Sequence, residues 1–445
     1  MMRVNRQRLW DSLMEMATIG ATARGGSCRL ALSDDEVRGR RRFIAWCEAA
    51  GCEIRIDPIG NLFARRPGTE PDAPAVMCGS HLDTQPLGGR FDGVYGVLAG
   101  LEAIRTLNEH GIATRHPIDV VAWTNEEGSR FTPGMMGSAV YAGKLDEHGI
   151  ATRHPIDVVA WTNEEGSRFT PGMMGSAVYA GKLDLDDALA RPCMHTGVRL
   201  GDELERTGFA GPARERQMPK AYFEAHIEQG PVLENAGVPI GVVTGVQGIV
   251  ELDVTVTGFE SHAGTTPMSV RKDAMGVAAA MIAAIVEHGH GFDADARVTV
   301  GHLACQPNSP STIPGQVRFS VDVRHPSRSA LQRLVADIGA ICTERTALRG
   351  THVDVQRIAE YDPIAFDAAC IERARQATIA AGYPYLEMFS GAGHDAVNLS
   401  YVAPSAMVFV PCKAGLSHNE AEDADPVHLA QGASVLANLL VDCAR

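Results

Sequence analysis

A perfect internal duplication constrains this chain more than any other feature of its sequence. The 38 residues from Glu109 to Asp146 recur without a single change from Glu147 to Asp184. Two identical segments cannot both occupy one place in a sheet, and two copies are too few for a stacked repeat architecture. Removing either copy leaves the same 407 of the 445 residues, a length that suits two domains.

We expect the first copy to hold the structural position, because it is synthesised first and joins directly to the preceding helix. The first copy carries the acidic pair Glu126-Glu127, and the second carries the identical pair Glu164-Glu165. The surplus copy contains an apolar strand, 156–161, whose unpaired backbone groups would favour association or proteolysis. A natural duplication and a cloning error are equally compatible with the sequence.

The composition is that of a soluble globular protein, with 45% hydrophobic and 21% charged residues. The formal net charge of −14 disfavours nucleic acid as a partner. The longest strongly apolar run, 274–286, is shorter than the roughly 18 residues of a membrane span, and no signal-peptide core opens the chain. Ten cysteines without a CxxC pair are expected to be reduced thiols. We therefore expect a cytoplasmic protein without membrane contact.

Hydrophobic periodicity divides the chain into three parts. Alternating apolar runs and amphipathic stretches in 1–247 and again in 361–445 predict an α/β domain. Between them, 248–360 has a β-α-β-β-α-β order, which predicts an inserted α+β domain. Its strands are expected at 250–256, 297–303, 316–324 and 352–358, and its helices at 273–287 and 329–345.

Histidine and carboxylate side chains follow predicted strands of the α/β part. His81 comes just after the strand that starts at residue 75, and Asp92 lies eleven positions later. Asp83 is spaced to hold the other ring nitrogen of His81. Each residue alone is more typical of a surface turn. Open α/β sheets, however, bind ligands at the carboxyl ends of their strands.

Two adjacent carboxylates, Glu126 and Glu127, follow the strand 118–123. Their side chains must diverge, so one can bind a metal while the other takes a proton from the attacking water. Further histidines beside carboxylates occur at His226 and His418. A two-metal hydrolase needs this mixture of imidazole and carboxylate ligands converging from several strand ends.

Nine segments, in order, carry a resemblance to a known family: HLDTQP, GRFDGVYGVLAGLEA, NEEGSRF, HIEQGPVLE, GVQG, HAGTTPM, IPGQVRFSVDVRHP, SGAGHDA and GLSHNE. They resemble the hydantoinase/carbamoylase branch of the M20 metallopeptidase superfamily, whose members include N-carbamoyl-L-amino acid hydrolases, β-ureidopropionases, and allantoate and ureidoglycolate amidohydrolases. The resemblance covers nearly the whole chain apart from the extra copy. It implies a mixed-sheet, dinuclear-metal, aminopeptidase-like catalytic domain with an inserted ferredoxin-like lid and dimerisation domain.

The resemblance also implies a role for each matching residue. Two divalent metal ions per subunit are expected, with zinc favoured and manganese, cobalt or nickel as alternatives. Asp92 would bridge the two ions, His81 and His226 would complete one site, Glu127 and His418 would complete the other, and Glu126 would be the general base.

The same resemblance assigns the substrate contacts. His262 of the lid would stabilise the oxyanion, and Asn308 and Arg324 would anchor a substrate carboxylate. Gln229, the backbone of Gly393, and His394 would address the carbamoyl group. The lid would form a homodimer and close on the metals about hinges near Gly245, Gly248 and residues 361–363.

The activity implied is hydrolysis of N-carbamoyl amino acids to the free amino acid, ammonia and carbon dioxide, with N-carbamoyl-β-alanine slightly preferred. Allantoate or ureidoglycolate hydrolysis is the alternative, whereas aminoacylase and dipeptidase activities are disfavoured by the HIEQGP and GAGHDA motifs. A third hypothesis is a folded metal-binding protein inactivated by its duplication. Thirty-eight extra residues beside Glu126 could displace it by more than the roughly 0.5 Å that catalysis tolerates.

Overall fold

The computed structural model describes residues 1–56, 61–70, 72–124, 126–127, 135, 138, 200–208, 219–347 and 350–445. The second copy of the duplicated segment, with Glu164, Glu165 and the strand expected at 156–161, lies outside these residues. The chain forms two compact units, which are described separately. Unit 1 comprises Met1–Thr244 and Phe366–Arg445, and unit 2 comprises Gly245–Ala365.

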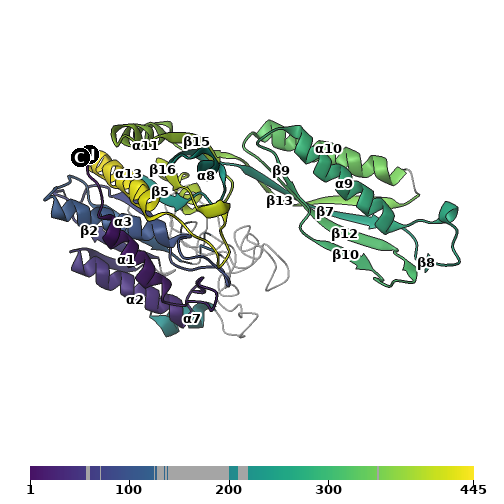
Figure 1. Ribbon diagram of the computed structural model, residues 1–445, viewed down its shortest axis with the longest axis horizontal. Coiled ribbons are helices and arrows are strands. Elements are labelled where there is room, and N and C mark those ends of the chain that lie inside the picture. Colours follow the sequence, from purple (N-terminus) through teal and green to yellow (C-terminus); the bar gives the residue numbers. More distant parts are fainter. Residues whose placement is uncertain are drawn as a thin grey trace. The chain divides into compact units, whose positions relative to one another are not determined.

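A mixed β-sheet lies at the centre of unit 1 (Figure 1). Strands β3, β4, β5 and β16 run parallel, whereas β2 is antiparallel to β4 and β6 is antiparallel to β16. The strand order is β1 (Glu53–Ile56), β2 (Leu62–Arg66), β4 (Ile118–Trp123), β3 (Val76–His81), β5 (Ala221–Ile227), β16 (Ser405–Val410) and β6 (Ile240–Val246), with β15 (Tyr385–Ser390) also paired to β6.

The central strands are buried along their whole length. Every residue of β3, β4, β5 and β16 is buried, because parallel strands covered on both faces need continuous apolar sequences. Helices α3 and α13 pack on each other and on β3 and β5. The helices of unit 1 are α1 (Arg6–Ala17), α2 (Asp34–Ala49), α3 (Val94–Glu109), α7 (Leu200–Thr207), α8 (Val232–Ala236), α11 (Ala368–Ala380), α12 (Asp395–Leu399) and α13 (Pro426–Ala444), with the short 3-10 turn η2 (Lys413–Gly415).

Unit 2 has the predicted β-α-β-β-α-β order (Figure 1). Its antiparallel sheet runs β10-β12-β7-β13, with β9 beside β12, and alternate residues of β7 are buried under α9 and α10. The elements are β7 (Gly248–Thr257), β8 (Ser261–His262), η1 (Met268–Val270), α9 (Ala274–Phe292), β9 (Arg297–Thr299), β10 (Leu303–Gln306), β11 (Thr312–Ile313), β12 (Gln316–His325), α10 (Arg328–Ala347), β13 (His352–Tyr361) and β14 (Ile364–Ala365). The predicted fold class, a mixed-sheet α/β domain with an α+β domain, is confirmed.

One strand of unit 2 differs from the expectation. The single strand predicted at 297–303 is two strands, β9 and β10, that pair with the same β12. Three residues lie between Thr299 and Leu303, but only two lie between their partners Asp322 and Phe319. The extra residue is a β-bulge, which interrupts the ladder.

Helix α9 also exceeds its expected length. Among the described residues, α9 and α13 each have 19 residues and are apolar enough to cross a membrane by length and composition alone. Helix α13 lies in the core, with 67% of its most apolar stretch buried, and α9 has 28% buried. Met281 and Ile285 of α9 belong to the core of unit 2. Long apolar helices of this kind occur in soluble cores and are weak evidence for a membrane span.

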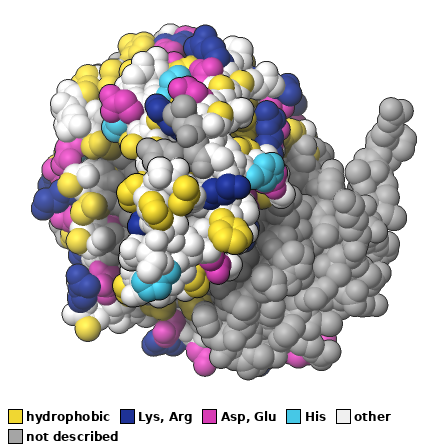
Figure 2. Space-filling model, turned by 90° about the vertical axis from the view of Figure 1, so that its right-hand side faces the viewer, with side chains coloured by type: hydrophobic (Ala, Val, Ile, Leu, Met, Phe, Trp, Pro, Cys, Tyr) yellow, Lys and Arg dark blue, Asp and Glu magenta, His cyan; other side chains and the backbone are white. Residues whose placement is uncertain are grey.

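The surface around β8 carries exposed apolar side chains. Phe259, Met268 and Val270 are 68%, 69% and 65% exposed, and they flank His262 in the sequence. Figure 2 views the molecule from this side, where apolar side chains lie among basic, acidic and histidine side chains. This end of unit 2 therefore presents a mixed apolar and charged surface.

Candidate metal centre

The candidate ligands gather at one edge of the unit 1 sheet. His81 is the last residue of β3, and His226 is the last but one of β5. Glu126 and Glu127 follow the end of β4 at Trp123, and His418 follows the end of β16. Because these four strands are parallel, their carboxyl ends meet at the same edge, where α/β sheets bind ligands.

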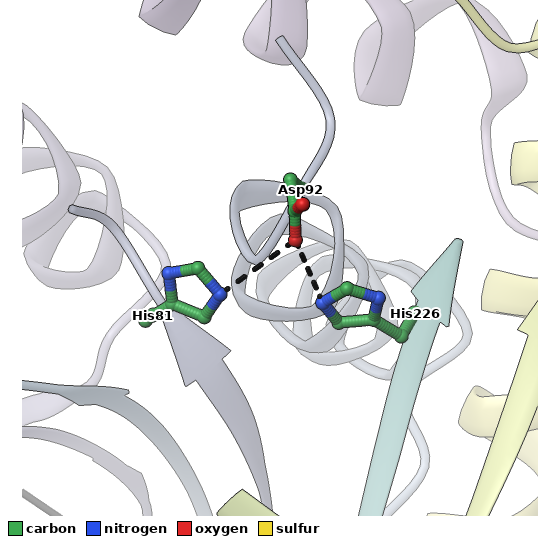
Figure 3. A group of neighbouring side chains, drawn as sticks. All are labelled: His81, Asp92 and His226. Atoms are coloured by element: carbon green, nitrogen blue, oxygen red, sulfur yellow. Dashed lines mark ion pairs between the residues drawn. The ribbon is translucent and has the colours of Figure 1, made fainter. Parts of the chain in front are cut away.

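Asp92 lies at the centre of the first ligand group (Figure 3). It comes just before α3 and points between the imidazoles of β3 and β5. Its Oδ1 atom lies 3.8 Å from Nε2 of His81 and 3.2 Å from Nε2 of His226. The three side chains are all buried, so this group is a compact cluster of two nitrogen donors and one oxygen donor.

The other carboxylate oxygen of Asp92 belongs to a second ligand group. Oδ2 lies 3.5 Å from Nε2 of His418, which in turn lies 3.4 Å from Oε2 of Glu127. The ligand atoms of each group lie within 4.8 Å of one another. Asp92 is thus shared by two groups, one through each oxygen.

The donor set fits divalent metal ions. Ligands bound tetrahedrally at about 2.0–2.1 Å stand about 3.3 Å apart, close to the 3.2–3.8 Å separations here. Burial raises the pKa of Glu126, with Asp395 adding to the effect, and burial and Asp92 raise the pKa of Glu127. Crowded buried carboxylates of this kind are relieved by a cation. These imidazole and carboxylate donors therefore form candidate ligand groups for divalent ions.

His81, His226 and Asp92 influence one another's pKa values. Burial lowers the pKa of His81 to about 4, so its neutral form, the metal-binding form, is favoured. Burial alone would lower the pKa of His226, but its hydrogen bond and ion pair with Asp92 raise that pKa to about 9. Burial likewise opposes ionisation of Asp92, yet His226, His81 and His418 together hold its pKa well below the ordinary range.

A model of a known protein family matches most of this sequence. The family model described as peptidase family M20/M25/M40 matches residues 77–143 and 131–442. The chain belongs to the M20 family.

Three relatives illustrate the similarity of this M20 chain to known proteins. The chain is 43% identical to an N-carbamoyl-L-amino-acid amidohydrolase of Rhizobium meliloti, over 100% of this chain and 97% of the relative. It is 32% identical to an allantoate amidohydrolase of Escherichia coli K12, over 99% and 98%. A crystal structure of a hydantoinase/carbamoylase family amidase from Burkholderia multivorans has a TM-score of 0.86 and 44% identity, over 100% and 98%.

Asp83 holds His81 in this M20 centre through its backbone. The sequence predicted that Asp83 holds the other ring nitrogen of His81. Nδ1 of His81 lies 2.9 Å from the backbone oxygen of Asp83, and 4.0 Å from its carboxylate. The carboxylate accepts hydrogen bonds of 3.1 Å from the backbone N–H groups of Glu126 and Glu127. Asp83 therefore holds the acidic turn in place as well as the first histidine.

The predicted carbamoyl contacts of unit 1 also lie at the metal centre. Gln229 donates a hydrogen bond of 2.9 Å from Nε2 to Oδ2 of Asp92. Its Oε1 atom is buried without a hydrogen-bond partner among the described residues. The ring of His394 lies 4.6 Å from that of His226, and its Nε2 lies 2.9 Å from Oγ of Ser390. Gly393 precedes His394 at the start of α12.

The predicted contacts of unit 2 are His262, Asn308 and Arg324. Nδ1 of His262 accepts hydrogen bonds of 2.9 and 3.2 Å from the backbone N–H groups of Gly264 and Thr265. Arg324 forms a bidentate pair with Asp322, with bonds of 2.8 and 2.9 Å. Asn308 has a left-handed backbone, with φ of 58°.

Backbone strain gathers at the predicted site residues. Among the six described non-glycine residues with positive φ are Gln229, Asn308 and His418, with φ of 58°, 58° and 53°. Such conformations cost of order 1–3 kcal/mol each and often occur at functional sites. Nothing in the local sequence motifs indicated these conformations.

Four residues of the centre were missed by the sequence analysis. Gln85 donates to Oε2 of Glu127 at 2.8 Å, and Glu224 accepts a 2.8 Å bond from Ser80, beside His81. The others are Ser417 and Glu422. Oγ of Ser417 contacts Oδ2 of Asp92, and the carboxylate of Glu422 accepts a hydrogen bond from the backbone N–H of Asp92. Gln85 and Ser417 lie inside recognised motifs, whereas Glu224 and Glu422 precede or follow them.

Gly93 gives a first prediction. A Cβ at this position would lie 2.3–2.4 Å from ring atoms of His81, and φ is 64°. Gly93→Ala should therefore displace His81, lower metal affinity, and cost more than the about 1–2 kcal/mol of a left-handed backbone, because ψ of −52° also lies outside the left-handed region. Gly237 has the same φ of 64°, a left-handed ψ of 32°, and open space at its Cβ. Gly237→Ala is therefore the matched control in denaturant unfolding and metal titration, and equal effects of both variants would contradict the prediction.

Proposed function

We propose that this chain is a metal-dependent amidohydrolase that cleaves the carbamoyl C–N bond of N-carbamoyl-L-amino acids. The observation that carries the proposal is Asp92, whose two oxygens face two separate groups of histidine and carboxylate ligands. The relative at 43% identity carries the name of this activity. It favours α-amino acid substrates over the N-carbamoyl-β-alanine that the motifs slightly preferred.

We propose two divalent ions, held by His81, Asp92, His226, Glu127 and His418. When bound, the ions would acidify a water molecule and polarise the ureido carbonyl. Zinc is favoured because the donors mix imidazole and carboxylate, and manganese, cobalt and nickel are the alternatives. Elemental analysis of protein purified without chelator identifies the metal.

Glu126 is proposed as the general base. Its Oε2 lies 3.1 Å from Nε2 of His81, at the margin of the first ligand group, and its backbone N–H is held by Asp83. From there the carboxylate takes the proton of the attacking water and returns it to the departing nitrogen. The C–N bond then breaks, ammonia leaves, and the remaining carbamate loses carbon dioxide to give the free amino acid.

His262 is proposed to stabilise the oxyanion. Because Nδ1 accepts two backbone hydrogen bonds, the neutral ring carries its proton on Nε2. Nε2 is then an N–H donor of the kind that an oxyanion requires. Asn308 and Arg324 are proposed to bind the substrate carboxylate, which would compete with Asp322 for two of the Arg324 donors. Gln229, Gly393 and His394 are proposed to contact the carbamoyl group.

The proposal also covers location, assembly and domain movement. We propose that the enzyme is a cytoplasmic homodimer joined through residues 248–360, with closure about Gly245, Gly248 and residues 361–363. An unchanged solution-scattering profile on addition of a substrate analogue would contradict closure.

Allantoate hydrolysis is the second candidate, favoured by the 32% identical Escherichia coli relative. Ammonia release should be measured in parallel with N-carbamoyl-L-amino acids, N-carbamoyl-β-alanine, allantoate and N-acetyl amino acids. We expect the highest kcat/KM with N-carbamoyl-L-amino acids and loss of activity on chelation, restored by a divalent ion. A higher kcat/KM with allantoate would establish the alternative, and no activity with any substrate would favour a protein inactivated by its duplication.

A further inference from the structure

Glu422 is a buried carboxylate behind the metal centre that the proposed catalytic steps do not use. It lies in the loop between β16 and α13, four residues after His418. Its Oε1 accepts hydrogen bonds of 2.8 Å from the backbone N–H of Phe91 and 3.2 Å from that of Asp92. A side chain from the C-terminal part of unit 1 therefore holds the backbone of the shared ligand.

The second oxygen of Glu422 reaches the same ligand through a side chain. Oε2 lies 3.1 Å from Oγ of Ser417, which also contacts Oδ2 of Asp92. Ser417 immediately precedes His418, whose ring belongs to the second ligand group. Glu422 thus connects the backbone of Asp92, its Oδ2 atom and the loop that carries His418.

The chain leaves space for this carboxylate at Gly89. A Cβ on Gly89 would lie 2.0 Å from Cδ of Glu422 and 2.1 and 2.3 Å from its two oxygens. Any larger residue would push the carboxylate away from the N–H groups of Phe91 and Asp92. The absence of a side chain at Gly89 therefore fixes where the Glu422 carboxylate lies.

The two histidines of the first ligand group are held by other contacts, whereas its third member, Asp92, is the ligand that Glu422 holds. His81 lies on β3 and His226 on β5, and their Nδ1 atoms lie 2.9 Å from the backbone oxygens of Asp83 and Ile227. In the second group, His418 lies in a loop, is 52% exposed, and has a left-handed φ of 53°. A loss of order around Glu422 should therefore affect the second group more than the first.

We propose that Glu422 is a positioning residue that orients Asp92 and His418 and so sets the occupancy of the Asp92-Glu127-His418 metal position. This inference rests on the proposed dinuclear function. Outer partners that orient metal ligands typically contribute 10–100-fold to metal affinity. A larger loss of affinity for the ion of the second group than for the ion of the first is the result expected when Glu422 is changed.

The test is calorimetric titration of the metal-free full chain with Zn²⁺. Wild type should bind two ions. Glu422→Gln removes the charge and one acceptor, and Gly89→Ala leaves Glu422 intact but displaces it. Each should bind the ion of the second group about 10–100-fold more weakly and show a smaller loss for the ion of the first group, because Asp92 is common to both groups. The matched controls are the exposed Glu48→Gln, and Gly339→Ala, where an added Cβ meets nothing within 4 Å.

The outcomes separate this inference from the function on which it rests. Two ions bound with wild-type affinity by both Glu422→Gln and Gly89→Ala would overturn the role of Glu422 and leave the dinuclear proposal standing. An equal loss of affinity for both ions, together with a lowered Tm, would indicate a general folding defect and would also overturn the role of Glu422. A wild type that binds fewer than two ions would refute the dinuclear proposal itself.

Discussion

Glu126→Gln should lower kcat for N-carbamoyl-L-amino acids by about 10²–10⁴-fold, the usual contribution of a general base. The amide keeps the shape of the side chain but cannot take a proton from water. The ions should remain bound, because Glu126 is not among the five proposed ligands. Steady-state ammonia release measures the loss, and zinc analysis of the same protein shows whether the ions are retained.

Glu164→Gln is the matched control, since its sequence surroundings are identical for many residues on either side. Activity should be unchanged in this variant if the first copy supplies the base. A loss in Glu164→Gln with none in Glu126→Gln would assign the base to the second copy. If neither change affects activity, the proposed base is wrong.

Asp92→Asn should abolish binding of the ion pair and with it the activity. The amide has one oxygen in place of two, so it cannot offer an anionic oxygen to both ligand groups. The loss of metal affinity should exceed the 10–100-fold typical of an outer partner, because Asp92 is the ligand common to both. Calorimetric titration with Zn²⁺ and ammonia release measure the two effects.

The control for Asp92→Asn is Asp253→Asn in unit 2. Asp253 is also mostly shielded, with 15% of its side chain exposed, and pairs with Arg318 at 2.7 Å. Losing that ion pair should leave Zn²⁺ binding and turnover unchanged, because neither residue belongs to the metal centre. Equal losses of metal in both variants would show that the effect of Asp92→Asn is a folding defect.

The sequence predicted strand bounds best where apolar residues dominate a short segment. The apolar runs at 118–123 and 405–410 coincide with β4 and β16 residue for residue, because strands buried on both faces are mostly apolar. The buried exceptions are Asp119, which pairs with Arg65, and Ser405. The split βαβ order of unit 2 was predictable from a different pattern, the alternation of buried and partly exposed residues along strands such as β7. Its bulge was not, because the pairing partner of each residue is set by tertiary structure.

The residues that form the candidate ligand groups could be predicted from the sequence. The contacts that hold these side chains in position could not. His81, Asp92, Glu126, Glu127, His226 and His418 meet at one sheet edge because parallel strands place their carboxyl ends together. Glu422 and Asp92 are 330 positions apart in sequence, so no local pattern links them. The backbone contacts of Asp83 and the left-handed φ of Gln229 were hidden for the same reason.

In the structure, the first copy of the duplicated segment supplies a strand of the unit 1 sheet. Strand β4 and the acidic pair that follows it belong to the first copy, and β4 pairs with both β2 and β3. The numbering of the proposed ligands and base therefore follows the first copy. The Glu126 and Glu164 variants above test this assignment in solution.

Anomalous diffraction from crystals of the zinc-loaded protein tests the central claim most directly. The account predicts two anomalous peaks on either side of the Asp92 carboxylate, about 3.5–4 Å apart, one beside His81 and His226 and the other beside Glu127 and His418. A single peak, or a peak whose acidic ligand is Glu165 in place of Glu127, would contradict it.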